Sequence, residues 1–99
     1  MDTQITLSLP ILRKGDSGHA GTIVRVQQML DPFISHGEKG TPVHHLQANG
    51  VFDTETETAV KGFQGMQVGL VEPIPVTGVV DQKTWNKLLT LWLSGDEPG

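Results

Sequence analysis

Asn49-Gly50-Val51-Phe52-Asp53-Thr54-Glu55-Thr56 is a stretch that returns twenty-eight residues later as Thr77-Gly78-Val79-Val80-Asp81-Gln82-Lys83-Thr84. Both copies contain a polar residue, Gly, two apolar residues, Asp and, three positions further on, Thr. The Gly permits a positive φ in a tight turn. The Asp can accept hydrogen bonds from the first free N–H groups of a helix, and its charge suits the positive end of the helix dipole. We therefore expect two helices, which start at Asp53 and Asp81.

Apolar residues recur at helical spacing in three segments, which predicts three amphipathic helices. The first helix begins near Gly21 and ends at Asp31-Pro32, because a residue that precedes Pro disfavours helical backbone. We expect the second helix to close at Gly69 in a left-handed conformation, with Leu70 folded back onto its last turn. The expected buried positions are Ile23, Val26 and Leu30 in the first helix, Ala59, Val60 and Phe63 in the second, and Trp85, Leu88, Leu89, Trp92 and Leu93 in the third.

The remaining segments have the composition of turns and extended connections. Leu7–Leu12 and Val71–Val76 are expected to be extended, and Arg13–Gly18 is a turn. Asp31–Ala48 is a long connection with three His, and a connection of that length in a small domain is functional or loosely ordered. The C-terminal Ser94–Gly99 has the composition of a flexible tail.

Length, cysteine content and net charge limit the classes of protein to which this chain can belong. The 99 residues fit a single domain over 1–99, with its core at about 9–93 and a flexible tail at 94–99. No cysteine is present, so neither a disulfide framework nor a zinc-thiolate site holds the fold. The net charge of −4 argues against a nucleic-acid partner. No stretch is suited to span a membrane, and the start lacks the basic and apolar regions of a signal peptide.

These features together resemble the peptidoglycan-binding-like domain of bacterial wall-lytic enzymes. The resemblance implies an all-α fold, a compact three-helix bundle with short extended connecting segments, and the apolar periodicity predicts the same three helices. It also implies a location in the cell wall or outside the cell. The segments that carry the resemblance are Leu12–Gly18, Val26–Leu30, Asn49–Phe52 with Thr56, Ala59-Val60, Phe63-Gln64, Gly69-Leu70, Gly78–Val80, Thr84-Trp85 and Leu88.

The residues that could suggest metal binding or catalysis have simpler explanations. His36, His44 and His45 share one loop, but adjacent His side chains diverge in an extended chain, so solvated histidines are favoured over a metal site. The Ser and Thr residues lie in turns and caps, where nothing activates one as a nucleophile. The carboxylates around Asp53 and Glu55 are better explained by capping and solubility than by glycoside cleavage. We expect no catalytic residue, no metal and no cofactor.

Aromatic and amide side chains also have structural explanations. Trp85 and Trp92 suit sugar stacking, but their helical spacing favours the core, with Trp92 the more exposed of the two. Gln27 and Gln64 match polar positions of the resembled family. Each is expected to hydrogen-bond loop backbone beside the core, as a buried amide requires.

The polar surface of the turns is the predicted ligand-binding site. If the bundle brings the turns together, short polar side chains and helix N-terminal N–H groups line one shallow groove that suits a peptide stem or its carboxylate. Arg13 is the expected cationic clamp. For any single residue, a role in capping alone is at least as good an explanation. The candidate ligand-binding residues are Arg13, Asp16, Ser17, Asn49, Asp53, Thr77 and Asp81.

The resemblance implies a non-catalytic module that targets bacterial peptidoglycan, through glycan or stem peptide, for an attached or partner wall-lytic enzyme. The alternative is a protein-interaction or prodomain-like module with the same fold and no glycan binding. Related propeptides block a metal with a cysteine, which this chain lacks. A small hydrolase that uses His44 and His45 is a third and weaker hypothesis.

Overall fold

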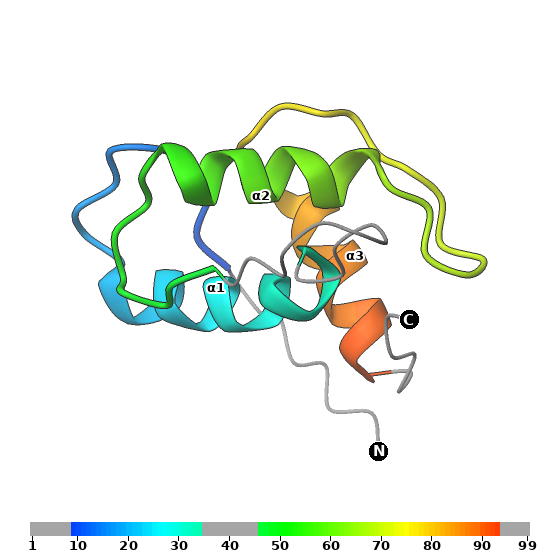
Figure 1. Cartoon of the computed structure of the whole chain (residues 1–99), viewed down its shortest axis with the longest axis horizontal. Coiled ribbons are helices and arrows are strands. Elements are labelled where there is room, and N and C mark those ends of the chain that lie inside the picture. The colour runs from blue at the N-terminus through cyan, green and yellow to red at the C-terminus, as the bar shows by residue number, and fades with distance from the viewer. Residues whose placement is uncertain (1–8, 35–45, 94–99) are drawn as a thin grey trace, which may run out of the picture.

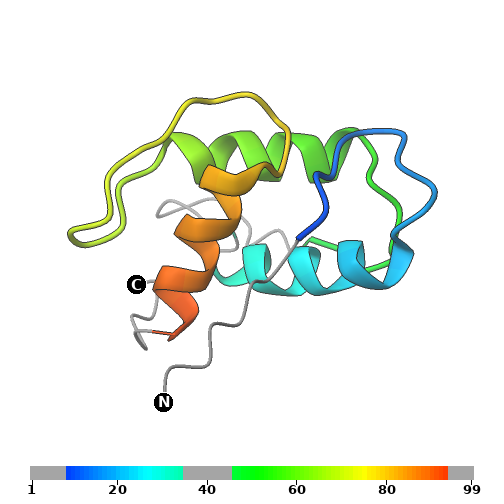
Figure 2. The ribbon, with the colours of Figure 1, turned by 180° about the vertical axis from the view of Figure 1, so that it is seen from behind.

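The computed structural model describes residues 9–34 and 46–93, which form three helices. These are α1 (Ala20–Ile34), α2 (Thr54–Gly65) and α3 (Gln82–Leu93). Figure 1 shows α1 and α2 as two layers with α3 crossing behind them, and Figure 2 shows α3 in front. The described residues contain no extended sheet, only isolated antiparallel bridges. The architecture is the all-α three-helix bundle that the sequence predicted.

Both predicted helix starts are confirmed. Asp53 caps α2, and its Oδ1 accepts a hydrogen bond from the Thr56 N–H at 3.0 Å. Asp81 does the same for α3, where its Oδ1 accepts from the Thr84 N–H at 3.0 Å. The preceding glycines have positive φ angles of 78° at Gly50 and 79° at Gly78. The repeated stretch therefore encodes one local structure twice.

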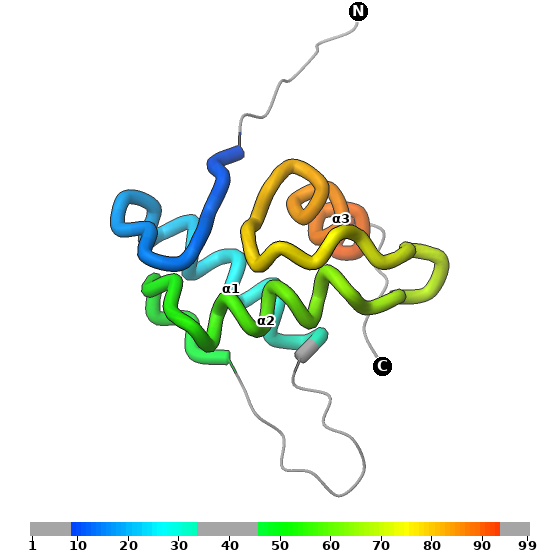
Figure 3. Tube along the Cα trace, turned by 90° about the horizontal axis from the view of Figure 1, so that it is seen from above, coloured from blue at the N-terminus to red at the C-terminus, as the bar shows by residue number. Residues whose placement is uncertain are grey.

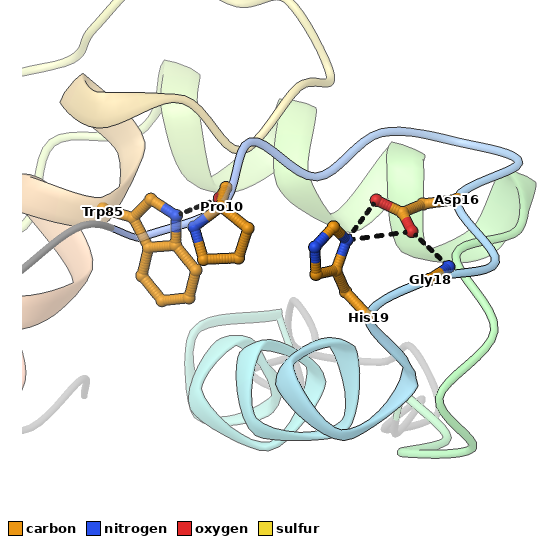
Figure 4. A network of polar contacts seen from close by, with 5 residues as sticks. All are labelled: Pro10, Asp16, Gly18, His19 and Trp85. Atoms are coloured by element: carbon orange, nitrogen blue, oxygen red, sulfur yellow. Dashed lines mark hydrogen bonds and ion pairs between the residues drawn. The ribbon is translucent and has the colours of Figure 1, made fainter.

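The core is assembled from all three helices and from the turns between them. The predicted positions of α1 and α2 are buried, and Leu12, Phe52 and Val80 add apolar side chains from the connecting segments. Trp85 is only 4% exposed. Its indole N–H donates to the Pro10 carbonyl at 2.8 Å (Figure 4). Trp85 is thus a core residue that also holds the N-terminal segment against α3.

The predicted end of the first helix is wrong, because α1 runs through Pro32 to Ile34. Phe33 is 6% exposed, and its ring packs edge-on against Phe63 with centroids 5.1 Å apart. The Asp31 Oδ1 also accepts a hydrogen bond from the Leu46 N–H at 2.7 Å. Tertiary packing in this last turn therefore outweighs the local effect of Pro on the residue before it.

The predicted closure of the second helix at Gly69 is also wrong. Helix α2 ends at Gly65, with Met66 as its C-cap. Gly69 does have a positive φ of 58°, but it lies in the turn between Val68 and Val71, which pair with each other. Leu70 is 97% exposed rather than folded back. Figure 3 shows this connection extending past the end of α2.

Lys87 explains why α2 needs no glycine closure. Its ammonium group, on α3, donates hydrogen bonds to the carbonyls of Phe63, Gln64 and Met66. These include carbonyls that the end of a helix leaves without intrahelical partners. A cation also suits the negative end of the helix dipole. Helix α2 is therefore closed by a side chain from another helix.

The buried face of α3 differs in part from the predicted stripe. Leu91 is fully buried, whereas Leu93 is 83% exposed. Trp92 is about half exposed, as expected, and its indole N–H donates to the Met29 carbonyl at 3.1 Å. Thr84 is fully buried, and its hydroxyl oxygen accepts a hydrogen bond from Gln64. The buried face is consequently turned toward Thr84, Leu88 and Leu91.

Candidate functional site

The turn before α2 is held by one buried amide, and we call this arrangement the Gln27 clamp. The Nε2 group of Gln27 donates to Asn49 Oδ1 at 3.2 Å, to the Val51 carbonyl at 3.0 Å and to Thr56 Oγ1 at 2.9 Å. Its Oε1 accepts from the Gly50 N–H at 2.9 Å. Gln27 is fully buried, so these bonds satisfy an amide that has no access to water.

The turn before α3 is held in the same way by the Gln64 clamp. The Nε2 group of Gln64 donates to Thr77 Oγ1 at 3.1 Å, to the Val79 carbonyl at 2.9 Å and to Thr84 Oγ1 at 2.9 Å. Its Oε1 accepts from the N–H groups of Thr77 and Gly78, each at 2.9 Å. The sequence prediction that both glutamines bind loop backbone beside the core is confirmed.

The N-terminal segment connects the three predicted turns. Leu12 and Val80 exchange two backbone hydrogen bonds of 3.1 and 2.8 Å. The Gly15 N–H donates to the Phe52 carbonyl at 3.1 Å. The N-terminal segment is therefore bonded to both of the other turns, to the third through Leu12 and to the second through Gly15 of the first turn. We call the polar surface of residues 13–17, 49–53 and 77–81 the turn surface.

The three aspartates of the turn surface are used internally. Asp16 Oδ1 accepts from the Gly18 N–H at 2.9 Å, and the His19 Nδ1 lies 3.0 Å from Asp16 Oδ2 (Figure 4). Asp53 and Asp81 are the helix caps described above. For Asp53 and Asp81 these contacts agree with the capping interpretation that the sequence left open, whereas Asp16 bonds Gly18 and His19, which precede α1.

Hydrogen bonding stabilises the ionised form of these carboxylates. The Gly18 N–H, followed by His19, lowers the pKa of Asp16 below its usual 3.8. The Thr56 N–H likewise lowers the pKa of Asp53. At Asp81 burial raises the pKa, but bonds from the N–H and hydroxyl of Thr84 outweigh it, and the net shift is downward. All three aspartates are therefore anionic at neutral pH.

Other members of the turn surface keep free groups. Arg13 and Ser17 are exposed, and within the described residues their side chains form no hydrogen bond or salt bridge. The side-chain oxygen of Asn49 accepts hydrogen bonds from the Gln27 amide and from the Val51 N–H. The hydroxyl oxygen of Thr77 accepts from the Gln64 amide and from the Val79 N–H. The Asn49 amide NH₂ makes no hydrogen bond within the same ranges and remains available as a donor.

A groove that the sequence did not predict lies along α3. Residues 70–74 form one side, and Lys83, Asn86, Lys87 and Thr90 form the other, around an open volume of about 510 Å³. None of the seven predicted site residues lines it. The polar spacing of residues 83, 86 and 90 on one helix face was a usable signal for one side. The other side depends on how residues 70–74 cross α3, which no sequence pattern indicates.

Lys87, in the middle of α3, is held by carbonyls at the end of α2 rather than free to bind a ligand. It is 3% exposed, and its ammonium lies 4.9 Å from the centroid of the Phe63 ring. Burial lowers its pKa below the usual 10.5. The three carbonyl acceptors and the aromatic face favour the charged form and offset part of that effect. Lys83 is consequently the available cation of the groove.

The predicted loop histidines lie outside the described residues. Within residues 9–34 and 46–93, no three His, Asp or Glu side chains gather in a way that would hold a metal ion. In the same part of the chain, no helix has the length and apolar character needed to cross a membrane.

Comparison with known proteins bears on what these turns do. A family model described as "Putative peptidoglycan binding domain" matches residues 23–88. The chain belongs to this family. The match begins at Ile23 in α1 and ends at Leu88 in α3, so it includes both glutamine clamps and both aspartate caps. Searches of curated proteins and of solved structures returned no match.

Membership of the peptidoglycan-binding domain family confirms the resemblance drawn from the repeated turns and the apolar spacing. It is a family of binding domains, which supports peptidoglycan as the ligand class. The three-helix architecture agrees with the fold expected for that family.

Proposed function

We propose that this chain is a non-catalytic module that binds bacterial cell-wall peptidoglycan and directs an attached or partner wall-active enzyme to its substrate. The family match over residues 23–88 carries this proposal. We treat residues 1–99 as one domain with a core at about 9–93. A weak binding module is sufficient for targeting, because tethering raises the effective concentration of substrate for the attached catalyst.

The turn surface is our proposed contact with the wall. Arg13 is exposed and free to pair with a carboxylate of the polymer, and Ser17 lies in the same turn. The free amide NH₂ of Asn49 adds a donor from the neighbouring turn. The carboxylates of Asp16, Asp53 and Asp81, together with Thr77, act by fixing the shape of the turns, since their oxygens accept internal hydrogen bonds.

Co-sedimentation with insoluble peptidoglycan from several wall types tests the proposal. The chain should pellet with wall, whereas an unrelated acidic protein and a destabilised Trp85→Ala variant should stay largely in the supernatant. No pelleting on any wall, from a chain shown by circular dichroism to be folded, would contradict wall binding and favour the protein-interaction alternative.

A double variant, Arg13→Ala with Ser17→Ala, tests the turn surface. It should reduce pelleting without lowering the unfolding temperature, because neither side chain bonds within the described residues. Asn49→Asp is a suitable third change, since it retains the oxygen that Gln27 and the Val51 N–H require but removes the free donor. Arg25→Ala is the matched control, as Arg25 is exposed on α1 and outside the turns. Unchanged pelleting of the double variant would reject the turn surface while leaving wall binding intact.

A further inference from the structure

The groove between residues 70–74 and α3 is open to solvent, with an open volume of about 510 Å³, and its two sides differ in chemistry. One side is mainly apolar, with Leu70 97% exposed and Pro73 and Ile74 beside it. The other side is the polar stripe of Lys83, Asn86 and Thr90 on α3. A ligand with both apolar and polar parts is therefore favoured.

The length of the groove suits a short extended peptide. Lys83 and Thr90 are seven residues apart on a helix, a rise of about 10 Å at roughly 1.5 Å per residue. The opposing segment leaves the Val68–Val71 turn and is neither helix nor strand over residues 72–74. A peptide at about 3.3 Å per residue would cover this distance with three or four residues. Glu72 also carries a backbone N–H and C=O that make no hydrogen bond within the described residues, as an extended ligand requires.

The charges on the two sides have opposite signs. The side chains of Lys83 on α3 and Glu72 on the facing segment are both exposed, and neither forms a salt bridge or hydrogen bond in the described part of the chain, although the charge of Lys83 also acts on Asp81. A ligand that carries both a carboxylate and an amine would satisfy both residues. No aromatic residue lines the groove, so it offers no stacking platform for a sugar ring. Both observations favour peptide over glycan.

We propose that this groove binds the stem peptide of peptidoglycan, with a stem carboxylate paired to Lys83 and the amine of its diamino acid paired to Glu72. This inference rests on the proposed wall-binding function and places one stem peptide of the polymer in a site separate from the turn surface, where Arg13 can meet the carboxylate of another. Leu70 and Pro73 would cover the methyl groups of the alanine residues. Asn86 would bind ligand backbone through its NH₂, because its Oδ1 accepts from Gln82.

Titration of the ¹⁵N-labelled full chain with a soluble synthetic stem tetrapeptide, followed by NMR, tests the site. The peptide has a free amine on its diamino acid and a free C-terminal carboxylate. Amide shifts should concentrate at residues 70–74 and 83–90. A second peptide, amidated at its C-terminus and acetylated on the amine, should bind more weakly because it lacks both charges.

Charge variants give the specific readout. Lys83→Gln and Glu72→Gln should each weaken binding of the free peptide about two- to fivefold, the range expected for an exposed ion pair. Neither variant should discriminate the free from the blocked peptide as well as the native chain does. Arg25→Gln is the matched control and should leave affinity unchanged. Loss of affinity from Leu70→Ser, which alters an exposed side chain, would support the apolar side of the site.

The outcomes separate this inference from the proposed function. Shifts that cluster at residues 13–17 and 49–53, with loss of affinity in the Arg13→Ala, Ser17→Ala variant, would place the peptide on the turn surface and overturn the groove. No shifts with any stem peptide, from a chain that still pellets with intact wall, would also overturn it and leave wall binding in place. A chain that neither shifts nor pellets would refute both.

Discussion

The Gln27 clamp and the Gln64 clamp make nearly the same hydrogen bonds but lie in different surroundings. Each glutamine reaches a polar side chain, a valine carbonyl and a threonine hydroxyl, and each accepts from a glycine N–H. The residues outside the clamps differ. The Gln64 clamp lies beside Trp85 in the core, whereas the equivalent position beside the Gln27 clamp is Glu57.

This equivalence follows from backbone hydrogen bonds. The Glu57 N–H donates to the Asp53 carbonyl and the Trp85 N–H donates to the Asp81 carbonyl, both at 2.9 Å. Glu57 is partly exposed, and its Oε1 lies 3.8 Å from the Nζ of Lys61, while Trp85 is buried. Short-range sequence therefore determines the turn, and contacts made over long sequence distances determine what packs against it.

The largest difference in stability between the two copies of the repeat is expected when the equivalent residues Trp85 and Glu57 are each replaced by alanine. Trp85→Ala should lower the free energy of unfolding by about 3–5 kcal/mol, because it leaves a cavity in the core. Glu57→Ala should change it by no more than about 0.5 kcal/mol, as is usual for surface positions. Urea unfolding followed by circular dichroism measures both.

Trp85→Phe separates the cavity from the lost hydrogen bond. It keeps an aromatic ring in the core but leaves the Pro10 carbonyl without the indole N–H. Its cost should therefore fall between that of the other two variants. Equal losses from Trp85→Ala and Glu57→Ala would show that the buried position of Trp85 does not contribute to stability.

The next largest effect is expected from the glutamines themselves. Gln27→Leu removes four hydrogen bonds, and Gln64→Leu removes five because the Thr77 N–H also binds Gln64. Each buried group left without a partner costs about 1–3 kcal/mol. Both variants should be strongly destabilised, and Gln64→Leu more so. Equilibrium unfolding gives the comparison, and Gln28→Leu, at an exposed position of α1, is the control.

Gly50 and Gly78, the glycines of the two turns, should respond differently when each is replaced by alanine. Alanine at either position is strained by the positive φ, at a cost of about 1–2 kcal/mol. A Cβ at Gly78 would also lie 2.9 Å from side-chain atoms of Glu57 and Lys61, and one at Gly50 would lie 3.1 Å from the Ala20 carbonyl oxygen. Side chains can move away more readily than helix backbone.

A background variant makes this difference measurable. In a chain that already carries Glu57→Ala and Lys61→Ala, Gly78→Ala should cost less than it does in the native chain, because the close contacts are gone. The same background should leave the cost of Gly50→Ala unchanged. An identical penalty for Gly78→Ala in both backgrounds would mean that strain at the positive φ accounts for all of it. Thermal unfolding measured for all variants decides this.

The features predicted correctly from the sequence are those determined by residues close together in the chain. Both caps, both positive-φ glycines and the buried positions of α1 and α2 were predicted correctly, because each is determined within a few residues. The end of α1 was wrong because Phe33 packs on Phe63 in another helix. The closure of α2 was wrong because Lys87 binds its last carbonyls. Both errors come from contacts that no local pattern contains.

In the candidate site, too, local features were predicted from the sequence and long-range contacts were not. The turns were predicted, and their connection through Leu12 and Gly15 was only a condition of the hypothesis until the structure showed it. The internal use of the aspartate oxygens was left open, as a carboxylate that caps a helix and one that binds a ligand have the same sequence signature. The groove along α3 was missed because one of its sides is a connection that crosses the helix.

The smallest expected difference concerns the two aspartate caps and their dependence on pH. Both carboxylates have a lowered pKa in the folded chain, Asp53 through the Thr56 N–H and Asp81 through Thr84 despite its burial. Stability from these caps is therefore fully present above the unfolded value of about 3.8 and is lost as pH falls through the folded value. At neutral pH, Asp53→Ala and Asp81→Ala should each cost about 0.5–2 kcal/mol. Asp81→Ala should cost the more, since Asp81 also accepts from the Thr84 hydroxyl.

The corresponding Asn variants show whether ionisation is what matters. Asn at an N-cap keeps an acceptor oxygen but does not titrate. Chains with Asp53→Asn or Asp81→Asn should lose less stability between neutral pH and the acid range than the native chain does, and unfolding followed across that range measures the difference. If the native chain and both Asn variants lost stability in parallel as pH fell, the caps would act through hydrogen bonding alone. The two turns would then share their geometry without contributing to the acid sensitivity of the fold.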